Sequence, residues 1–239
     1  MWETTVKGRP LRFYLAGINN QNFIMRDAET GSWWQQVTGE AIQGPLKGTK
    51  LKPVLHDELT FGVWKQEQPR GRVLKPDHRV ASSYEAENWE EQYAKFPVVV
   101  PVDSADRLSP RALIIGIEIG GHAKAYPFTA LERQSPILDE LGKTPLLIVL
   151  GEDRKSVRAF DRSVDGRTLE FFVKPDTRPL QLIDAETGTA WDFTGKAGSG
   201  QLAGKQLKQI TLLKDYWFDW KIYHPQTTIY LLGEREAIR

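Results

Sequence analysis

The chain has 239 residues, with 32 Lys and Arg against 31 Asp and Glu, so its formal charge at pH 7 is +1. This near-neutral balance gives no basis for binding nucleic acid or an anionic membrane surface. Hydrophobic residues make up 40% of the chain, which is enough for a packed core and excludes wholesale disorder. No apolar run approaches the roughly 20 residues that a membrane-spanning helix needs. The sequence has no cysteine, so disulfides, thiolate nucleophiles and Cys-ligated zinc are excluded.

Short β-rich segments separated by turns fill the first part of the chain. A hairpin is predicted around Asp-Ala-Glu-Thr-Gly at 27–31, because this connection ends in glycine, as hairpins with a bulge do. A short helix is predicted over 59–68, where apolar residues have helical spacing and Pro69 ends the run. The strands that we expect here are 11–16, 23–26, 32–36, 51–55 and 73–74.

A charged, proline-containing stretch follows and is predicted to be a connector with one helix at 84–95. Beyond it, Gly120-Gly121 is a dipeptide that two-residue hairpin turns prefer. The elements that we expect in the last part are strands at 113–119, 122–126, 146–150, 157–161, 169–174, 180–183 and 229–232, and short helices at 127–134 and 216–223.

Long helices are absent from this pattern, and short strands with glycine turns dominate it. The predicted fold class is therefore mainly β with a few short helices (α+β). Many short strands at regular spacing are typical of a sandwich or a barrel-like architecture, and the pattern leaves both open.

Two segments of the chain share one order of glycine and tryptophan residues. The sequence Asp-Ala-Glu-Thr-Gly at 27–31 returns letter for letter at 184–188, and further matches follow at nearly constant offset. Such self-similarity predicts a duplicated β-rich unit. Because tryptophan buries a large area and fixes how neighbouring elements pack, we expect the four repeated tryptophans in the core: Trp34, Trp191, Trp64 and Trp220.

The two copies are unequal in length. Residues 114–162 precede the second copy and have no counterpart before the first. We therefore expect the chain to be a fragment of a longer protein with a further segment before Met1. The predicted organisation is a partial first unit at 1–75, a connector at 76–112 and a complete second unit at 113–239.

The motifs of the second copy resemble those of a known family. They are Ile-Glu-Ile-Gly-Gly-His-Ala-Lys-Ala-Tyr-Pro at 117–127, Lys-Thr-Pro-Leu-Leu-Ile at 143–148, Phe-Asp-Arg at 160–162 and Asp-Gly-Arg at 165–167. Together with the repeated Asp-x-x-Thr-Gly-x-x-Trp stretches, they resemble DUF3179 domains, with one complete unit preceded by a partial one. That family is of unknown function, and the resemblance implies a bacterial envelope protein outside the cytoplasm.

The chain departs from the family pattern at one place. Family units usually hold Cys-x-x-Cys just before the Phe-Asp-Arg strand, and those positions are Gly151 and Arg154 here. Neither residue binds metal through sulfur or exchanges a disulfide. If the family's chemistry depends on those cysteines, the resemblance implies that this chain is chemically silent, or that active cysteines lie before Met1.

The titratable residues form no catalytic or metal-binding motif. No two of the four histidines stand four residues apart, and His56-Asp57-Glu58 alternates between strand faces, so we expect a solvated turn there. The acidic pairs at 27/29 and 184/186 are predicted to form turns, because Asp at a turn start accepts backbone N–H bonds. We predict no catalytic residue, no metal ligand and no cofactor.

The candidate ligand-binding residues are Trp33, Gln35, Arg26 and His122. Adjacent side chains on a strand point to opposite faces, so Trp34 is expected in the core and Trp33 on the other side. An exposed tryptophan beside Gln35 could stack on a sugar. We favour the alternative, that Trp33 covers a sheet face against a segment before Met1, since the first unit is predicted to be incomplete.

The leading expectation is a non-catalytic binding or structural module of the bacterial envelope, whose partner is a small ligand or a protein. Two alternatives stay open. One is a redox or metal-dependent enzyme whose active cysteines lie before Met1. The other is carbohydrate binding through Trp33.

Overall fold

The computed structural model describes residues 1–19, 22–99 and 106–233. Short strands, nearly all antiparallel, make up most of its regular structure and helices are few and short, which confirms the predicted class. The four-stranded sheets are open, each with two edge strands. Within the described residues, no helix is long and apolar enough to cross a membrane.

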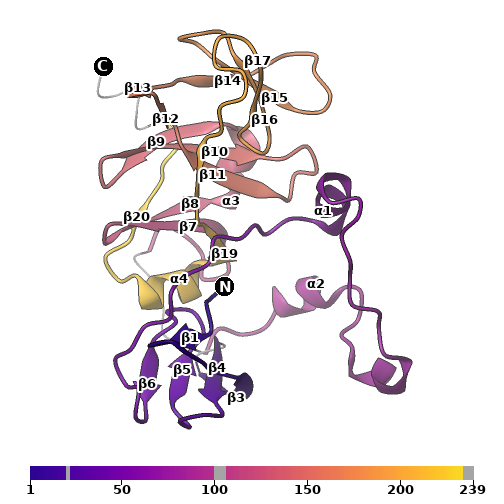
Figure 1. The fold of residues 1–239 in the computed structure, drawn as a ribbon, viewed down its shortest axis with the longest axis vertical. Coiled ribbons are helices and arrows are strands. Elements are labelled where there is room, and N and C mark those ends of the chain that lie inside the picture. The colour runs from indigo at the N-terminus through magenta and orange to yellow at the C-terminus, as the bar shows by residue number, and fades with distance from the viewer. Residues whose placement is uncertain (20–21, 100–105, 234–239) are drawn as a thin grey trace.

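Four sheets are stacked along the long axis of the molecule (Figure 1). In order along the sheet, the first contains β3 (Phe13–Asn19), β4 (Asn22–Asp27), β5 (Trp33–Gln35) and β6 (Ala41–Gln43). The second contains β19 (Leu213–Tyr216), β7 (Leu113–Ile119), β8 (His122–Pro127) and β20 (Thr228–Ile229), of which β20 runs parallel to β8. The third contains β18 (Lys208–Ile210), β11 (Val157–Asp161), β10 (Thr144–Leu150) and β9 (Ile137–Leu141). The fourth contains β14 (Phe171–Val173), β15 (Gln181–Asp184), β16 (Ala190–Asp192) and β17 (Ala197–Ser199).

Two-stranded ribbons and short helices complete the fold. The ribbons pair β1 (Thr5–Val6) with β2 (Arg9–Pro10), and β12 (Ser163–Val164) with β13 (Arg167–Thr168). The helices are α1 (Phe61–Glu67), the 3-10 helix η1 (His78–Ser83), α2 (Trp89–Tyr93), α3 (Phe128–Arg133) and α4 (Trp217–Tyr223).

Strand β10 lies between two hydrophobic cores. Leu146, Ile148 and Leu150 contact the core beneath β7 and β8, whereas Leu147 and Val149 contact the core beneath β15 and β16. Successive side chains of a strand point to opposite faces, so a run of five apolar residues fits a sheet that is covered on both sides. The third sheet is therefore the central layer of the larger part of the molecule.

Two segments build the same succession of elements and the same buried hydrogen bonds. A two-stranded ribbon is followed by a four-stranded antiparallel sheet in β1–β6 and again in β12–β17. The indole of Trp34 donates to Asp27 Oδ2 over 2.8 Å, and the indole of Trp191 donates to Asp184 Oδ2 over 2.8 Å. Both aspartates also accept turn N–H groups, as predicted from their position in the sequence. Each carboxylate thus fixes its hairpin turn and its core tryptophan together.

The helices α1 and α4 differ in what they cover. In α4, Trp220 is buried and its ring lies directly on Gly116 of β7, where a Cβ atom would be only 2.4 Å from it. In α1 no residue is buried, and Trp64 is half-exposed. The core position expected for Trp34, Trp191 and Trp220 is confirmed, whereas that expected for Trp64 is wrong, because no sheet lies under α1 as β7 lies under α4.

Four predicted elements differ from the structure, and one of them, the strand expected at 229–232, shares only Ile229 with β20. Residues 51–55 form no strand beyond an isolated bridge of Pro53 to Trp2, since proline cannot donate to a ladder. Residues 73–74 form none, because they are exposed and have no neighbouring strand. The helix expected at 84–95 is only Trp89–Tyr93, because its surface buries nothing and a short exposed helix gains too little to extend.

We predict that Gly200→Ala destabilises the fold more than Gly204→Ala. Both glycines have positive φ, at +99° and +86°, which costs an L-residue about 1 kcal/mol or more. Only at Gly200 would the added Cβ also lie 2.7 Å from the Thr189 Cα atom, and such overpacking costs roughly 1–3 kcal/mol more. Urea unfolding of both variants measures this difference, and equal losses would contradict the packing argument.

Candidate functional site

The segment that contains α1 leaves the first sheet and crosses to the third and fourth sheets (Figure 1). Thr60 begins the helix: its hydroxyl accepts from the Val63 N–H and donates to Asp153 Oδ2 over 2.7 Å. Its own N–H donates to Ser156 Oγ over 3.0 Å. A residue that caps the helix therefore also attaches it to the loop between β10 and β11.

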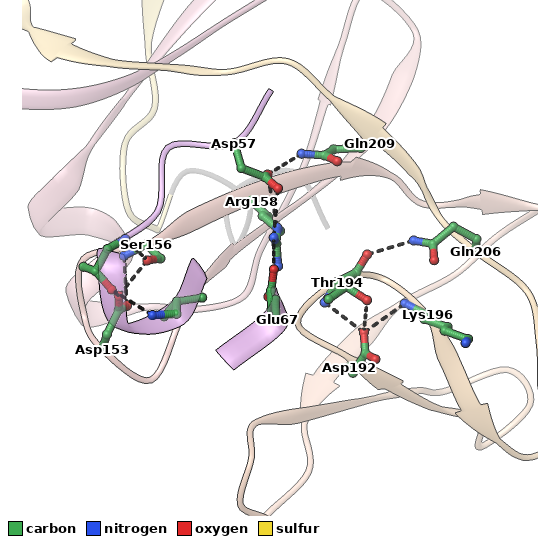
Figure 2. A network of polar contacts seen from close by, with 12 residues as sticks. Asp57, Glu67, Asp153, Ser156, Arg158, Asp192, Thr194, Lys196, Gln206 and Gln209 are labelled. Atoms are coloured by element: carbon green, nitrogen blue, oxygen red, sulfur yellow. Dashed lines mark hydrogen bonds and ion pairs between the residues drawn. The ribbon is translucent and has the colours of Figure 1, made fainter. Parts of the chain in front are cut away.

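Arg158 is the centre of the contacts between this segment and the sheets (Figure 2). It lies on β11 with only 5% of its side chain exposed. Its guanidinium donates to both oxygens of Asp57, over 3.1 and 2.8 Å, and to both oxygens of Glu67, over 2.7 Å each. Two bidentate carboxylates match the donor geometry of one guanidinium, and such charge-assisted pairs are the strong ones.

The surroundings of Arg158 complete this buried charge cluster. The guanidinium carbon lies 4.8 Å from the Phe193 ring centroid, and Gln209 donates to Asp57 Oδ1 over 2.5 Å. Burial works against ionisation of Asp57, but the hydrogen bonds and charge of Arg158 hold its pKa below the usual range. Burial also works against the charged form of Arg158 and so lowers its pKa. The hydrogen bonds to Glu67 and Asp57 raise that pKa by more. Asp57 and Arg158 are thus both charged near neutral pH.

Asp153 organises the loop between β10 and β11. It accepts from the Ser156 hydroxyl over 2.6 Å and from the Ser156 N–H over 2.9 Å, in addition to Thr60. Burial would raise the pKa of Asp153, but these bonds hold it below the ordinary value. Gly151 is in this loop, and a Cβ atom there would lie 3.1 Å from Asp153 Oδ1 and 3.2 Å from Phe193 Cζ.

A pocket of about 510 Å³, here named the α1 pocket, lies between α1, this loop and the fourth sheet. Its apolar wall includes Phe193, Leu180 and Val63. Four of its lining residues carry carboxylates, and none of the lining residues in the described part of the chain is Lys or Arg. The four are Glu67, Glu152, Asp153 and Asp192.

Hydrogen bonds hold the polar side chains around the pocket in place. The Ser156 hydroxyl donates to Asp153, which fixes the loop at one side of the pocket. Asp192 accepts from the Thr194 hydroxyl and N–H, which fixes the turn at the pocket rim. Among residues 1–19, 22–99 and 106–233, no group of three or more His, Cys, Asp or Glu side chains is placed to hold a metal ion.

A second acidic cluster lies where the first sheet contacts α4. Burial, and then the Asp219 charge, raise the pKa of Asp215 to about 8. Burial also raises the pKa values of Asp219 and Glu58. The Asn22 side chain of β4 donates to Asp219 Oδ1, and the Tyr223 ring of α4 lies beside the same carboxylate. Asp215 and Asp219 therefore hold their protons to a higher pH than ordinary carboxyl groups do.

The structure brings three of the four candidate ligand-binding residues together. Trp33, Arg26 and Gln35 lie on β4 and β5, and the Arg26 guanidinium lies 5.6 Å from the Trp33 ring centroid. Arg26 also donates to the Gly31 carbonyl, so it belongs to the hairpin. His122 is exposed on β8, in another sheet, and none of the four lines the α1 pocket. Trp34 is fully buried and Trp33 is half-exposed, as alternation predicts, while sugar binding through Trp33 stays a prediction.

The solvated turn expected at His56-Asp57-Glu58 is wrong. Asp57 is bonded to Arg158, and burial raises the pKa of Glu58. The prediction missed Arg158 because its partners stand 91 and 101 residues earlier in the chain. One signal was available: a single arginine within the apolar strand at 157–160 indicates a buried charge that requires partners.

A family model described as "Protein of unknown function (DUF3179)" matches residues 1–227 of the chain. No curated protein and no solved structure matches it significantly.

We predict that Arg158→Leu lowers the free energy of unfolding by about 3 kcal/mol, the low end for breaking a buried pair. Asp57 and Glu67 keep 29% and 25% of their side chains exposed, so water partly compensates their charges. Urea unfolding measures the loss. In the control Lys205→Leu, which breaks the exposed pair with Asp165, the loss is about 1 kcal/mol or less. Equal losses in the two variants would contradict a buried charge cluster.

We also predict that the protein becomes less stable as the pH rises from about 5 to 8. The unfolded chain releases the Asp215 proton near pH 4, whereas the folded chain holds it until about 8, so ionisation favours unfolding across this range. Asp215→Asn removes this contribution, so the decline is shallower in the variant. Urea unfolding at a series of pH values tests this, and parallel pH profiles would contradict it.

Proposed function

The chain belongs to the DUF3179 family, whose function is unknown, and from its own geometry we propose a non-catalytic binding module. The ligand is a small organic cation with an apolar body, and it binds in the α1 pocket. The observation that carries this proposal is the combination of four carboxylates with an apolar wall and no basic lining residue among those described.

Electrostatics supports a cation over an anion. Arg158 lies behind the pocket wall and carries one positive charge. The two negative charges of its partners, Asp57 and Glu67, outweigh it. Glu152 and Asp192 add negative charge at the lining. Carboxylates in a recess of low dielectric attract a cation more strongly than they would in bulk water.

The size of the pocket and its apolar wall indicate that part of the ligand is apolar. A volume of about 510 Å³ lies within the range of small-molecule sites, which are lined largely by apolar and aromatic side chains. Phe193 offers a ring and Leu180 and Val63 offer aliphatic surface. A ligand with an ammonium group on an aromatic or aliphatic body can place the ammonium group near the carboxylates and its apolar part against the apolar wall.

The pocket is held in shape before any ligand arrives. Thr60 bonds to Asp153 and Ser156 at the start of α1, and Glu67 bonds to Arg158 at its end. A helix fixed at both ends loses little freedom on binding, which favours affinity.

The comparison of α1 with α4 supports a duplicated origin of the chain. Both helices end at a residue with nearly the same backbone angles, at Gln68 and His224, and both follow an aspartate–tryptophan hairpin. On this proposal, residues 1–75 and 113–239 are two units and 76–112 joins them. Because α1 has no sheet of its own beneath it, it is available as a wall of the pocket.

The test uses benzylammonium and its anionic counterpart, benzoate, in thermal shift and calorimetry. We predict that benzylammonium raises Tm in a concentration-dependent way, because a ligand that binds only the folded state stabilises it, and that benzoate does not. Glu152 is exposed at the rim, and none of the described hydrogen bonds or ion pairs involves its side chain. Glu152→Gln therefore weakens benzylammonium binding by about two- to fivefold without loss of stability.

The matched control is Glu140→Gln, which removes the same charge from the exposed face of β9 outside the pocket and leaves binding unchanged. Equal Tm shifts with benzylammonium and benzoate, no shift with either, or equal effects of the two Gln variants would contradict the proposal.

A further inference from the structure

Residues 70–99 form an arm that extends away from the stacked sheets (Figure 1). The chain runs outward after α1, passes through η1, and returns through α2 toward the body. Within these residues only Asp77 and Val98 are half-buried, and every other side chain is exposed. Most of the arm's side chains therefore face solvent, and Arg111 donates to the Phe96 carbonyl at its returning end.

The arm nevertheless carries large apolar side chains. Val73, Leu74 and Val80 are exposed on the outgoing half, with Leu74 98% exposed. Trp89, Tyr93 and Phe96 are exposed on the returning half. Their rings contact one another in series, with centroids 5.6 and 4.9 Å apart, so they make one continuous aromatic surface. Contiguous apolar surface of this kind marks an interaction site.

Charge divides the arm into two limbs of opposite sign. The basic limb, residues 70–79, carries four Arg or Lys side chains and one Asp, and the acidic limb, residues 85–95, carries four Glu and one Lys. Within the arm the structure describes one ion pair, between Arg79 and Asp77, and it lies inside the basic limb. The two limbs thus present opposite charges to solvent without neutralising each other.

We propose that the arm binds the arm of a second copy of this chain around a two-fold axis. In such an interface the same surface meets itself, so it must be self-complementary. With the two arms antiparallel, each basic limb lies against the partner's acidic limb. The aliphatic side chains of each basic limb then cover the aromatic surface of the partner's acidic limb. The same arrangement therefore pairs opposite charges and buries apolar surface.

The distribution of charge favours a second copy over an anionic membrane. Aromatic side chains that enter a membrane surface act best beside basic residues. Here the aromatic surface lies on the acidic limb, among Glu87, Glu90 and Glu91, which anionic lipids repel. A basic, aliphatic limb is the complementary surface, and this chain supplies one itself.

Sedimentation velocity over a concentration series tests the proposal with two charge-reversed variants. One is Glu87→Lys/Glu90→Lys/Glu91→Lys, which makes both limbs basic, and the other is Arg70→Glu/Arg72→Glu/Lys75→Glu, which makes both acidic. We expect the natural chain to dimerise, more weakly at high salt, and each variant alone to have a dimer Kd higher by about tenfold or more. An equimolar mixture of the two variants restores the dimer, because opposite limbs meet again.

The changed residues are all exposed, and urea unfolding of each variant verifies that its fold is intact. The proposal is overturned if the natural chain stays monomeric at all concentrations, if either variant dimerises as tightly as the natural chain, or if the mixture stays monomeric. Flotation with phosphatidylserine vesicles by a chain that is monomeric in solution would assign the arm to membranes and overturn it as well.

Discussion

A buried guanidinium on β11 is the constraint on which the arrangement of the chain depends. Arg158 is almost fully removed from water, so it requires compensating charge, and both of its carboxylates come from the segment around α1. Together with the bonds of Thr60 to Ser156 and Asp153, these ion pairs hold a helix that buries none of its own residues beside the third and fourth sheets. The α1 pocket lies beside this helix, and its wall includes Phe193, whose ring centroid lies 4.8 Å from the Arg158 guanidinium carbon.

Several hairpins and helices could be predicted from the sequence because they depend on neighbouring residues, whereas strands such as β9 and β16 were not predicted. The hairpins around 27–31 and at Gly120-Gly121 form where glycine permits positive φ, and Trp34 is buried where alternation places it. The failures have non-local causes. Trp64 has the sequence context of Trp220, but no strand lies beneath it, and residues 51–55 lack a strand because Pro53 interrupts the ladder.

The candidate site was largely beyond sequence reasoning for the same physical reason. Asp57, Glu67 and Arg158 are ordinary charged residues until the fold brings them within hydrogen-bond distance. The aspartates at 27 and 184 were interpreted correctly because each bonds to groups within seven residues of itself. Contacts between residues that are close in the sequence can be predicted from the sequence. A pocket between distant segments depends instead on how the sheets stack.

The separation between Arg158 and its partners also has a consequence for biosynthesis. The carboxylates at 57 and 67 leave the ribosome well before the strand that needs them, and the intervening chain includes the whole arm. The recess beside α1 therefore cannot exist in a nascent chain that has not yet produced the third sheet. The recess also needs Leu180 and Phe193 as part of its wall, so a chain that ends before residue 180 lacks that side of it.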